Sequence, residues 1–131
     1  MYAELHCLTH YSFLRGASAP EELVGRAANS GYHALAITDE CSLAGIVKAH
    51  VAAKERGLKL IVGSEFTLTE GIRLIALVPS REAYGELSGL ISRARRRSGK
   101  GEYRVHLRDV IFHLKRCLLI LLPDDTDNQT V

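Results

Sequence analysis

Four side chains in the first half of the chain could do metal or acid–base chemistry. His6 lies near the start, Asp39 and Glu40 follow a short apolar run, and Glu65 follows a second apolar run. Imidazole and carboxylate groups bind zinc, manganese and iron, and such a metal can activate water for phosphoester hydrolysis. The alternative is that these polar groups lie at the open end of a barrel-like fold, where they are hydrogen-bonded or solvated and bind no metal. The residues by themselves leave both interpretations open.

A weak internal repeat indicates how two of these carboxylates would come together. Gly31 precedes Asp39 by eight residues, and Gly57 precedes Glu65 by eight residues. Each copy runs from a helix through the glycine and an apolar strand to the carboxylate. Consecutive parallel strands joined by a helical crossover are usually neighbours, and the chemistry of such folds lies at their carboxyl ends. We therefore expect two neighbouring parallel strands that carry these carboxylates at the same end.

Hydrophobic periodicity indicates an α/β fold with strands and helices in alternation. Ser18 and Glu21 have the spacing of a capping box, which predicts the start of the first helix there. Ser42 and Ser80 are expected to cap two further helices. The expected strands are 2–8, 34–37, 58–66, 72–78 and 118–122, with a short helix at 106–114.

Composition excludes several classes of protein. The formal net charge is only +2, so overall charge names no partner, and 47% of the residues are hydrophobic, which allows a sizeable core. Cys7, Cys41 and Cys117 form no Cys-Xaa-Xaa-Cys pair, so neither a zinc ribbon nor a disulfide framework is predicted. We see no signal peptide and no run long enough to cross a bilayer. We therefore expect a cytoplasmic protein with no membrane partner.

A basic stretch between residues 93 and 104 could contact phosphates. Its candidate contact residues are Arg93, Arg95, Arg96, Arg97 and Lys100. Each contact with a nucleic-acid phosphate would add salt-dependent affinity, and an acidic partner protein would be attracted in the same way. The alternative is a solvated helix end, where positive charge also complements the helix dipole.

Several motifs together resemble one known family. They are Glu4-Leu-His6-Cys-Leu8-Thr9, Tyr11-Ser-Phe-Leu-Arg15-Gly16, Ile37-Thr38-Asp39-Glu40 and Val62-Gly63-Ser-Glu65. They resemble the N-terminal polymerase-and-histidinol-phosphatase (PHP) domain of bacterial C-family DNA polymerases, above all the error-prone paralogue of the alpha subunit. The resemblance covers most of residues 1–115, which we interpret as a PHP-like domain. Residues 116–131 are interpreted as a final strand and a polar, frayed tail.

The resemblance implies a fold and a parent protein. The fold would be the first half of a distorted (β/α)7 barrel, with parallel strands and the helices outside. The parent would be a Mg-dependent DNA-directed DNA polymerase, a nucleotidyltransferase that acts in DNA replication, repair or damage-induced translesion synthesis. Its partners would be DNA and other mutagenesis or replication proteins. The open sheet edge of a half-barrel would also favour dimerisation of this chain.

Compared with active members of that family, the expected metal site has lost several ligands. Leu8 stands in place of the second histidine of a His-Xaa-His pair, and Glu40 stands in place of the histidine of a Thr-Asp-His motif. Arg15 and Arg73 also stand where active members carry ligands. Because these arginines are cations in a pocket made for cations, we expect them to pair with the remaining carboxylates.

We therefore predict a degenerate metal site made of His6, Asp39, Glu40 and Glu65, with no catalytic residue in this chain. A divalent zinc or manganese ion would bind weakly at most. The favoured function is a structural, inactive PHP domain of an error-prone polymerase. The alternatives are a metal-dependent phosphoesterase or 3′–5′ exonuclease of the PHP superfamily, and an interaction module that works through the basic stretch.

Overall fold

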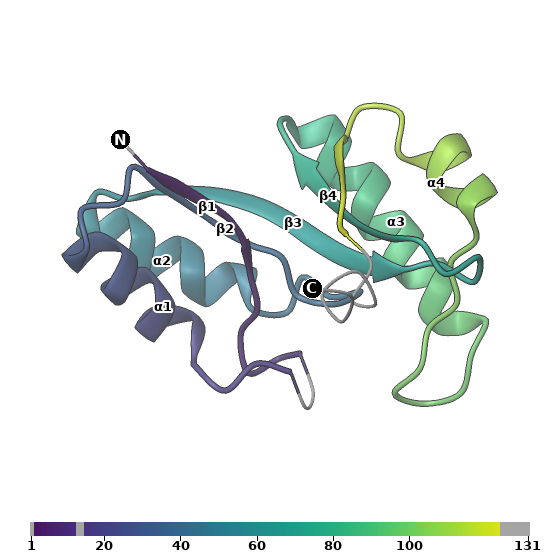
Figure 1. The fold of residues 1–131 in the computed structure, drawn as a ribbon, viewed down its shortest axis with the longest axis horizontal. Helices are drawn as coiled ribbons and strands as arrows, with labels where there is room; N and C mark the ends of the chain where they lie inside the picture. The colour runs from purple at the N-terminus through teal and green to yellow at the C-terminus, as the bar shows by residue number, and fades with distance from the viewer. Residues whose placement is uncertain (1, 13–14, 124–131) are drawn as a thin grey trace, which may run out of the picture. The chain divides into compact units, whose positions relative to one another are not determined.

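The computed structural model describes residues 2–12 and 15–123 and has the α/β fold that the sequence predicts (Figure 1). Its elements are β1 (Ala3–Cys7), α1 (Pro20–Asn29), β2 (Ala34–Ile37), α2 (Ile46–Arg56), β3 (Lys59–Thr67), β4 (Arg73–Val78), α3 (Arg81–Arg96), α4 (Leu107–His113) and β5 (Leu118–Leu121). The polar tail predicted at 124–131 lies outside the described residues. None of the helices in the described part of the chain is long and apolar enough to span a membrane.

The five strands form one mixed sheet in the order β1-β2-β3-β4-β5. β2 pairs in parallel with β1 and with β3, where Leu35 is opposite Leu60 and Ile37 is opposite Val62. This pairing confirms the two neighbouring parallel strands that the glycine repeat predicts. β4 and β5 are antiparallel, so the expectation of parallel strands fails for this last pair.

The chain divides into two compact units, residues 1–64 and 65–131. In the first unit, α1 and α2 pack side by side against β2 (Figure 1). The core of this unit consists of Val24, Ala27, Leu35, Ile37, Ile46, Ala49, Ala53 and Leu58. In the second unit, α3 packs against β4 and buries Ala83, Leu87, Leu90 and Ala94. Each unit therefore has an apolar helix face of its own.

The first helix begins one residue later than the predicted capping box. Its N-cap is Ala19, which is extended, and Pro20 is the first helical residue. Proline disfavours helical geometry in the residue before it and suits the first helical position, so the helix starts at this boundary. The Ala19 amide donates to the Glu22 carboxylate at 3.2 Å, which replaces the predicted pair of Ser18 and Glu21.

Of the two other predicted helix caps, Ser80 is confirmed and Ser42 is wrong. α2 starts at Ile46 behind Gly45, and the Ser42 hydroxyl instead accepts a hydrogen bond two residues further along the chain, in a turn before the helix. Ser80 caps α3 as predicted, because its hydroxyl accepts a hydrogen bond from the Ala83 amide at 3.2 Å.

Candidate functional site

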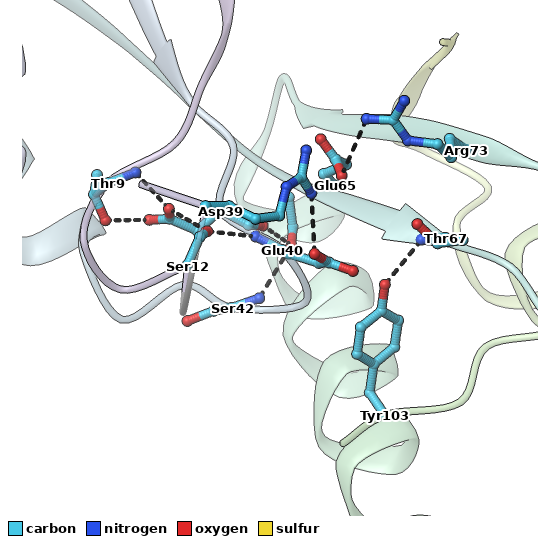
Figure 2. A network of polar contacts seen from close by, with 11 residues as sticks. Thr9, Ser12, Asp39, Glu40, Ser42, Glu65, Thr67, Arg73 and Tyr103 are labelled. Carbon is cyan, nitrogen blue, oxygen red and sulfur yellow. Dashed lines mark hydrogen bonds and ion pairs between the residues drawn. The ribbon is translucent and has the colours of Figure 1, made fainter. Parts of the chain in front are cut away.

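The Asp39 carboxylate is the centre of a buried hydrogen-bond network in the first unit (Figure 2). Its Oδ1 accepts hydrogen bonds from the Thr9 amide at 2.6 Å and from the Ser12 hydroxyl at 2.7 Å. Its Oδ2 accepts one from the Thr9 hydroxyl at 2.7 Å. Only 1% of Asp39 is exposed to solvent. The carboxylate therefore ties the loop after β1 to the end of β2.

Further hydrogen bonds join the segment 39–42 to the loop after β1 and to β3. The Ser12 hydroxyl accepts a hydrogen bond from the Glu40 amide at 3.0 Å. On the β3 side, the Ser64 hydroxyl donates to the Asp39 carbonyl at 2.7 Å and accepts from the Ser42 amide at 3.1 Å. Because backbone and side chain are both held, this segment has a fixed position within its unit.

Two glycines pack closely against the same network. A Cβ atom on Gly16 would lie 2.0 Å from the Thr9 carbonyl oxygen, so only glycine fits there. A Cβ atom on Gly45 would lie 3.3 Å from the Asp39 carboxylate and 3.3 Å from the Thr9 hydroxyl. The close approach at Gly16 explains why the loop after β1 needs a glycine at that point.

Each of the two arginines at expected ligand positions lies beside a carboxylate. Arg15 Nη1 is 3.0 Å from Glu40 Oε1 in the first unit, and both side chains are partly exposed. Arg73 Nη2 is 3.8 Å from Glu65 Oε2 in the second unit, where the Glu65 side chain is fully buried. Glu65 depends more on its arginine than Glu40 does, because a buried carboxylate has lost its hydration. That these pairs replace a metal remains a prediction.

The donor groups do not fit the metal centre that the family resemblance implies. Among residues 2–12 and 15–123, no group of three or more His, Cys, Asp and Glu side chains is placed to hold a metal ion. Leu8 offers no donor atom, and both Asp39 oxygens already accept hydrogen bonds. Glu40 and Glu65 each lie beside a guanidinium group.

The fourth candidate, His6, lies on β1 and faces a pocket of about 390 Å³. The pocket lies in the first unit, and Glu4, Cys7, Arg26 and Tyr32 also line it. Asp39 and Glu40 are not among its lining residues, so this pocket does not unite the predicted ligands of the first unit.

In the second unit, Arg97 of the basic stretch forms a bidentate ion pair with Asp109. Its two terminal nitrogens lie 2.7 Å and 3.1 Å from the carboxylate oxygens. The His106 amide donates to the same carboxylate at 2.9 Å. The Arg97 guanidinium, together with this amide, lowers the pKa of Asp109 to about 2. Arg97 therefore anchors the start of α4.

Arg95 holds the loop between α3 and α4. Its guanidinium lies 5.3 Å from the centre of the Tyr103 ring and donates to the Glu102 carbonyl at 3.2 Å. The Tyr103 hydroxyl in turn accepts a hydrogen bond from the Thr67 amide at 2.9 Å (Figure 2). This arginine is thus engaged within the protein.

The predicted phosphate contacts therefore divide into two groups. Arg93 lies within 3.1 Å of His113 Nδ1 and, like Arg95 and Arg97, has a contact inside the second unit. Arg96 and Lys100 are exposed. Contact of this stretch with nucleic acid remains a prediction.

The sequence analysis did not single out the hydroxyl groups that surround Asp39. Thr9, Ser12 and Ser64 all belong to the motifs that carry the family resemblance. Thr9 directly follows the predicted strand 2–8, Ser12 lies in the loop after it, and Ser64 directly precedes Glu65. The available signal was therefore a set of hydroxyl groups near predicted strand ends, where a buried acceptor needs donors. Asp109 was missed as well, although it lies three residues after the start of the predicted helix 106–114, in the first turn, where an acid is favourable.

Comparison with known proteins identifies the family. The model of the PHP domain matches residues 4–124. The error-prone DNA polymerase of Saccharophagus degradans is 66% identical over 122 residues, which cover 93% of this chain and 12% of the relative. The error-prone DNA polymerase of Methylococcus capsulatus is 52% identical over 132 residues, which cover 99% of this chain and 13% of the relative. The chain thus spans about an eighth of the length of these relatives.

Two solved structures share the fold. A candidate metal-dependent phosphoesterase from Bifidobacterium adolescentis is 32% identical with a TM-score of 0.60, over 73% of this chain and 34% of the other. An amidohydrolase from Chromobacterium violaceum, with bound sulfate and no metal, is 27% identical with a TM-score of 0.60 over the same shares. The predicted family resemblance is confirmed: this chain belongs to the PHP domain family.

Proposed function

We propose that this chain is the PHP domain of an error-prone DNA polymerase and that the domain is structural and lacks phosphoesterase activity. The polymerase relatives, at 52% and 66% identity, support the parent. That parent would be a cytoplasmic enzyme that uses Mg to add nucleotides to a DNA 3′ end during repair or damage-induced translesion synthesis. The observation that carries the inactivity is the pairing of Arg15 with Glu40 and of Arg73 with Glu65.

The charges of these pairs explain why they would oppose metal binding. Each guanidinium is always protonated and brings one positive charge to a carboxylate that would otherwise be available to a cation. A divalent ion would have to displace the arginine and leave its charge without that partner. In the buried Glu65 pair this cost would be largest, since water screens it least.

The test uses the full-length polymerase that carries this chain. We expect no stoichiometric zinc or manganese by elemental mass spectrometry. Hydrolysis of a model phosphodiester and of a 3′-labelled primer should be no faster than in the Glu65→Ala variant. Glu86→Ala is the matched control, because Glu86 also pairs with an arginine, at 3.0 Å, but that arginine, Arg116, is mostly exposed.

The alternative is an active metal-dependent phosphoesterase or 3′–5′ exonuclease. The likeness to the candidate phosphoesterase at 32% identity favours it. Stoichiometric metal, with hydrolysis that Glu65→Ala abolishes and Glu86→Ala does not, would establish this alternative and remove our proposal. Absence of DNA-directed nucleotide incorporation by the full-length protein would remove the polymerase parent.

We also propose three kinds of partner: DNA through the parent polymerase, other mutagenesis or replication proteins, and a second copy of this chain. β5 is the last strand in the sheet order, and its Leu118 and Leu121 are 59% and 70% exposed. An exposed apolar edge strand favours pairing with another chain. Light scattering of the 131-residue chain should therefore show a dimer that Leu119→Lys converts to a monomer, and a monomeric unmodified chain would exclude this association.

A further inference from the structure

The outer face of α4 combines an exposed aromatic ring with a cation. Phe112 is 70% exposed and the neighbouring Ile111 is 68% exposed. The Lys115 ammonium lies 5.4 Å from the centre of the Phe112 ring. The His113 ring meets the same ring edge to face, with 5.4 Å between their centres. A large ring held between polar groups and left open to solvent is not a core residue of its unit.

Helix spacing brings a second cation to this face. Arg108 precedes Phe112 by four residues, so the two side chains lie on the same side of the helix. The opposite side of α4 is buried, with Val110 and Leu114 in the interior. We call Arg108, Phe112 and Lys115 the α4 face.

The surroundings leave the α4 face positive. Asp109, the acid on this helix, is in the bidentate pair with Arg97. α4 contacts α3 (Figure 1), and Glu86 of α3 lies 3.0 Å from Arg116. Both of these carboxylates are therefore paired with arginines. A third carboxylate, Glu70, accepts a hydrogen bond from the Leu107 amide at 3.0 Å at the start of the helix. Within residues 2–12 and 15–123, Arg108 and Lys115 form no ion pair, so these two cations outnumber the one unpaired carboxylate.

We propose that the α4 face binds single-stranded nucleic acid, with one base stacked on Phe112 and phosphates beside Arg108 and Lys115. An exposed ring flanked by cations is the combination that holds unpaired bases and their backbone. A duplex keeps its base faces stacked inside and would not reach the ring. This site differs from the basic stretch, and it does not depend on whether the domain hydrolyses phosphoesters.

The test measures the affinity of the full-length protein for a fluorescent oligothymidylate by fluorescence anisotropy. Phe112→Ala should weaken binding by between about 5-fold and about 100-fold, the range expected for one stacked base. Phe112→Trp, which keeps an aromatic face, should retain the affinity. Ile111→Ala is the matched control, since Ile111 is equally exposed on the same turn but has no aromatic face.

The dependence on salt gives a second readout. Lys115→Gln should reduce the slope of log affinity against log salt concentration by about 0.7, the value for one phosphate of a single strand. Duplex DNA of the same sequence length should show no change with Phe112→Ala. Equal effects of Phe112→Ala and Ile111→Ala, or a lowered melting temperature with unaltered oligonucleotide affinity, would overturn the proposal in favour of a protein-packing surface.

Discussion

Removing the Asp39 carboxylate should release the loop after β1 from the end of β2. Three donors, the Thr9 amide, the Thr9 hydroxyl and the Ser12 hydroxyl, lie 2.6 to 2.7 Å from its oxygens. A hydrogen bond to a charged group contributes about 1.5–3 kcal/mol, and a buried donor left without a partner costs about 1–3 kcal/mol. Because the three bonds share one carboxylate, their effects do not add, and we expect Asp39→Ala to cost about 3–5 kcal/mol.

The more conservative Asp39→Asn substitution separates shape from charge. The amide keeps the size and one acceptor oxygen but places a second donor opposite the Thr9 hydroxyl. We therefore expect an intermediate loss of about 1.5–3 kcal/mol. Glu40→Gln is the control, since its partly exposed pair with Arg15 should be worth no more than about 1 kcal/mol.

Urea unfolding followed by circular dichroism measures these differences, and hydrogen exchange reports on the loop itself. The Thr9 amide should exchange faster in Asp39→Asn than in the unmodified chain, because its acceptor is weakened. If Asp39→Ala costs no more than Glu40→Gln, the network does not hold the loop and our account of Asp39 is wrong.

Three further outcomes are expected from the described contacts. The folded pKa of Asp109 is depressed to about 2. The ionised carboxylate should therefore stabilise the fold above about pH 4, and this stabilisation should be lost as the pH falls through about 2. We expect a loss of about 1–2 kcal/mol after allowance for the 35% exposed Arg97 side chain, seen as lower urea midpoints between pH 5 and pH 2 and absent in Asp109→Asn. In thermal unfolding, Gly16→Ala should destabilise the protein by about 3 kcal/mol or more, because the added Cβ would lie 2.0 Å from a backbone carbonyl oxygen. Gly85→Ala in α3 is the control: nothing lies within 4 Å of its added Cβ, so it should stabilise the protein by up to about 1 kcal/mol. Burial raises the pKa of the Cys117 thiol to about 11, so mass spectrometry should show slow alkylation at pH 8 that accelerates above pH 10, and rapid labelling at pH 8 would contradict the burial.

The pattern of strands was predictable because it depends on local sequence. The glycines before 34–37 and 58–66 both adopt left-handed conformations, with φ of 76° at Gly31 and 66° at Gly57. A glycine that ends a helix and an apolar run that follows it are visible within about ten residues. The parallel pairing of β2 with β3 followed from that repeat together with the general preference for neighbouring crossovers.

The surroundings of the candidate site were not predictable in the same way. Asp39 is 30 residues from Thr9 and 27 from Ser12 in the sequence, so no local pattern announces that these groups meet. The sequence showed a carboxylate at a strand end, which suits a ligand and a loop tie equally. Only the folded arrangement shows that hydroxyl and amide donors occupy its oxygens.

The partners of the basic stretch were also not predictable from the local sequence. A run of arginines at a helix end looks solvated because the sequence does not reveal which partners the arginines meet. Arg97 finds Asp109 twelve residues later, and Arg95 finds the ring of Tyr103. Charge patterning therefore predicted where positive side chains gather but not which of them the protein uses for its own structure.

The two arginine–carboxylate pairs differ from a metal site in that they form without any ion from solution. Arg15 with Glu40 and Arg73 with Glu65 are made of side chains that are translated with the chain. A bound metal must be taken from the medium, and its capture releases protons and fails in the presence of a chelator. These contacts require no such delivery, so a cell short of zinc or manganese can still form both of them as soon as the chain folds.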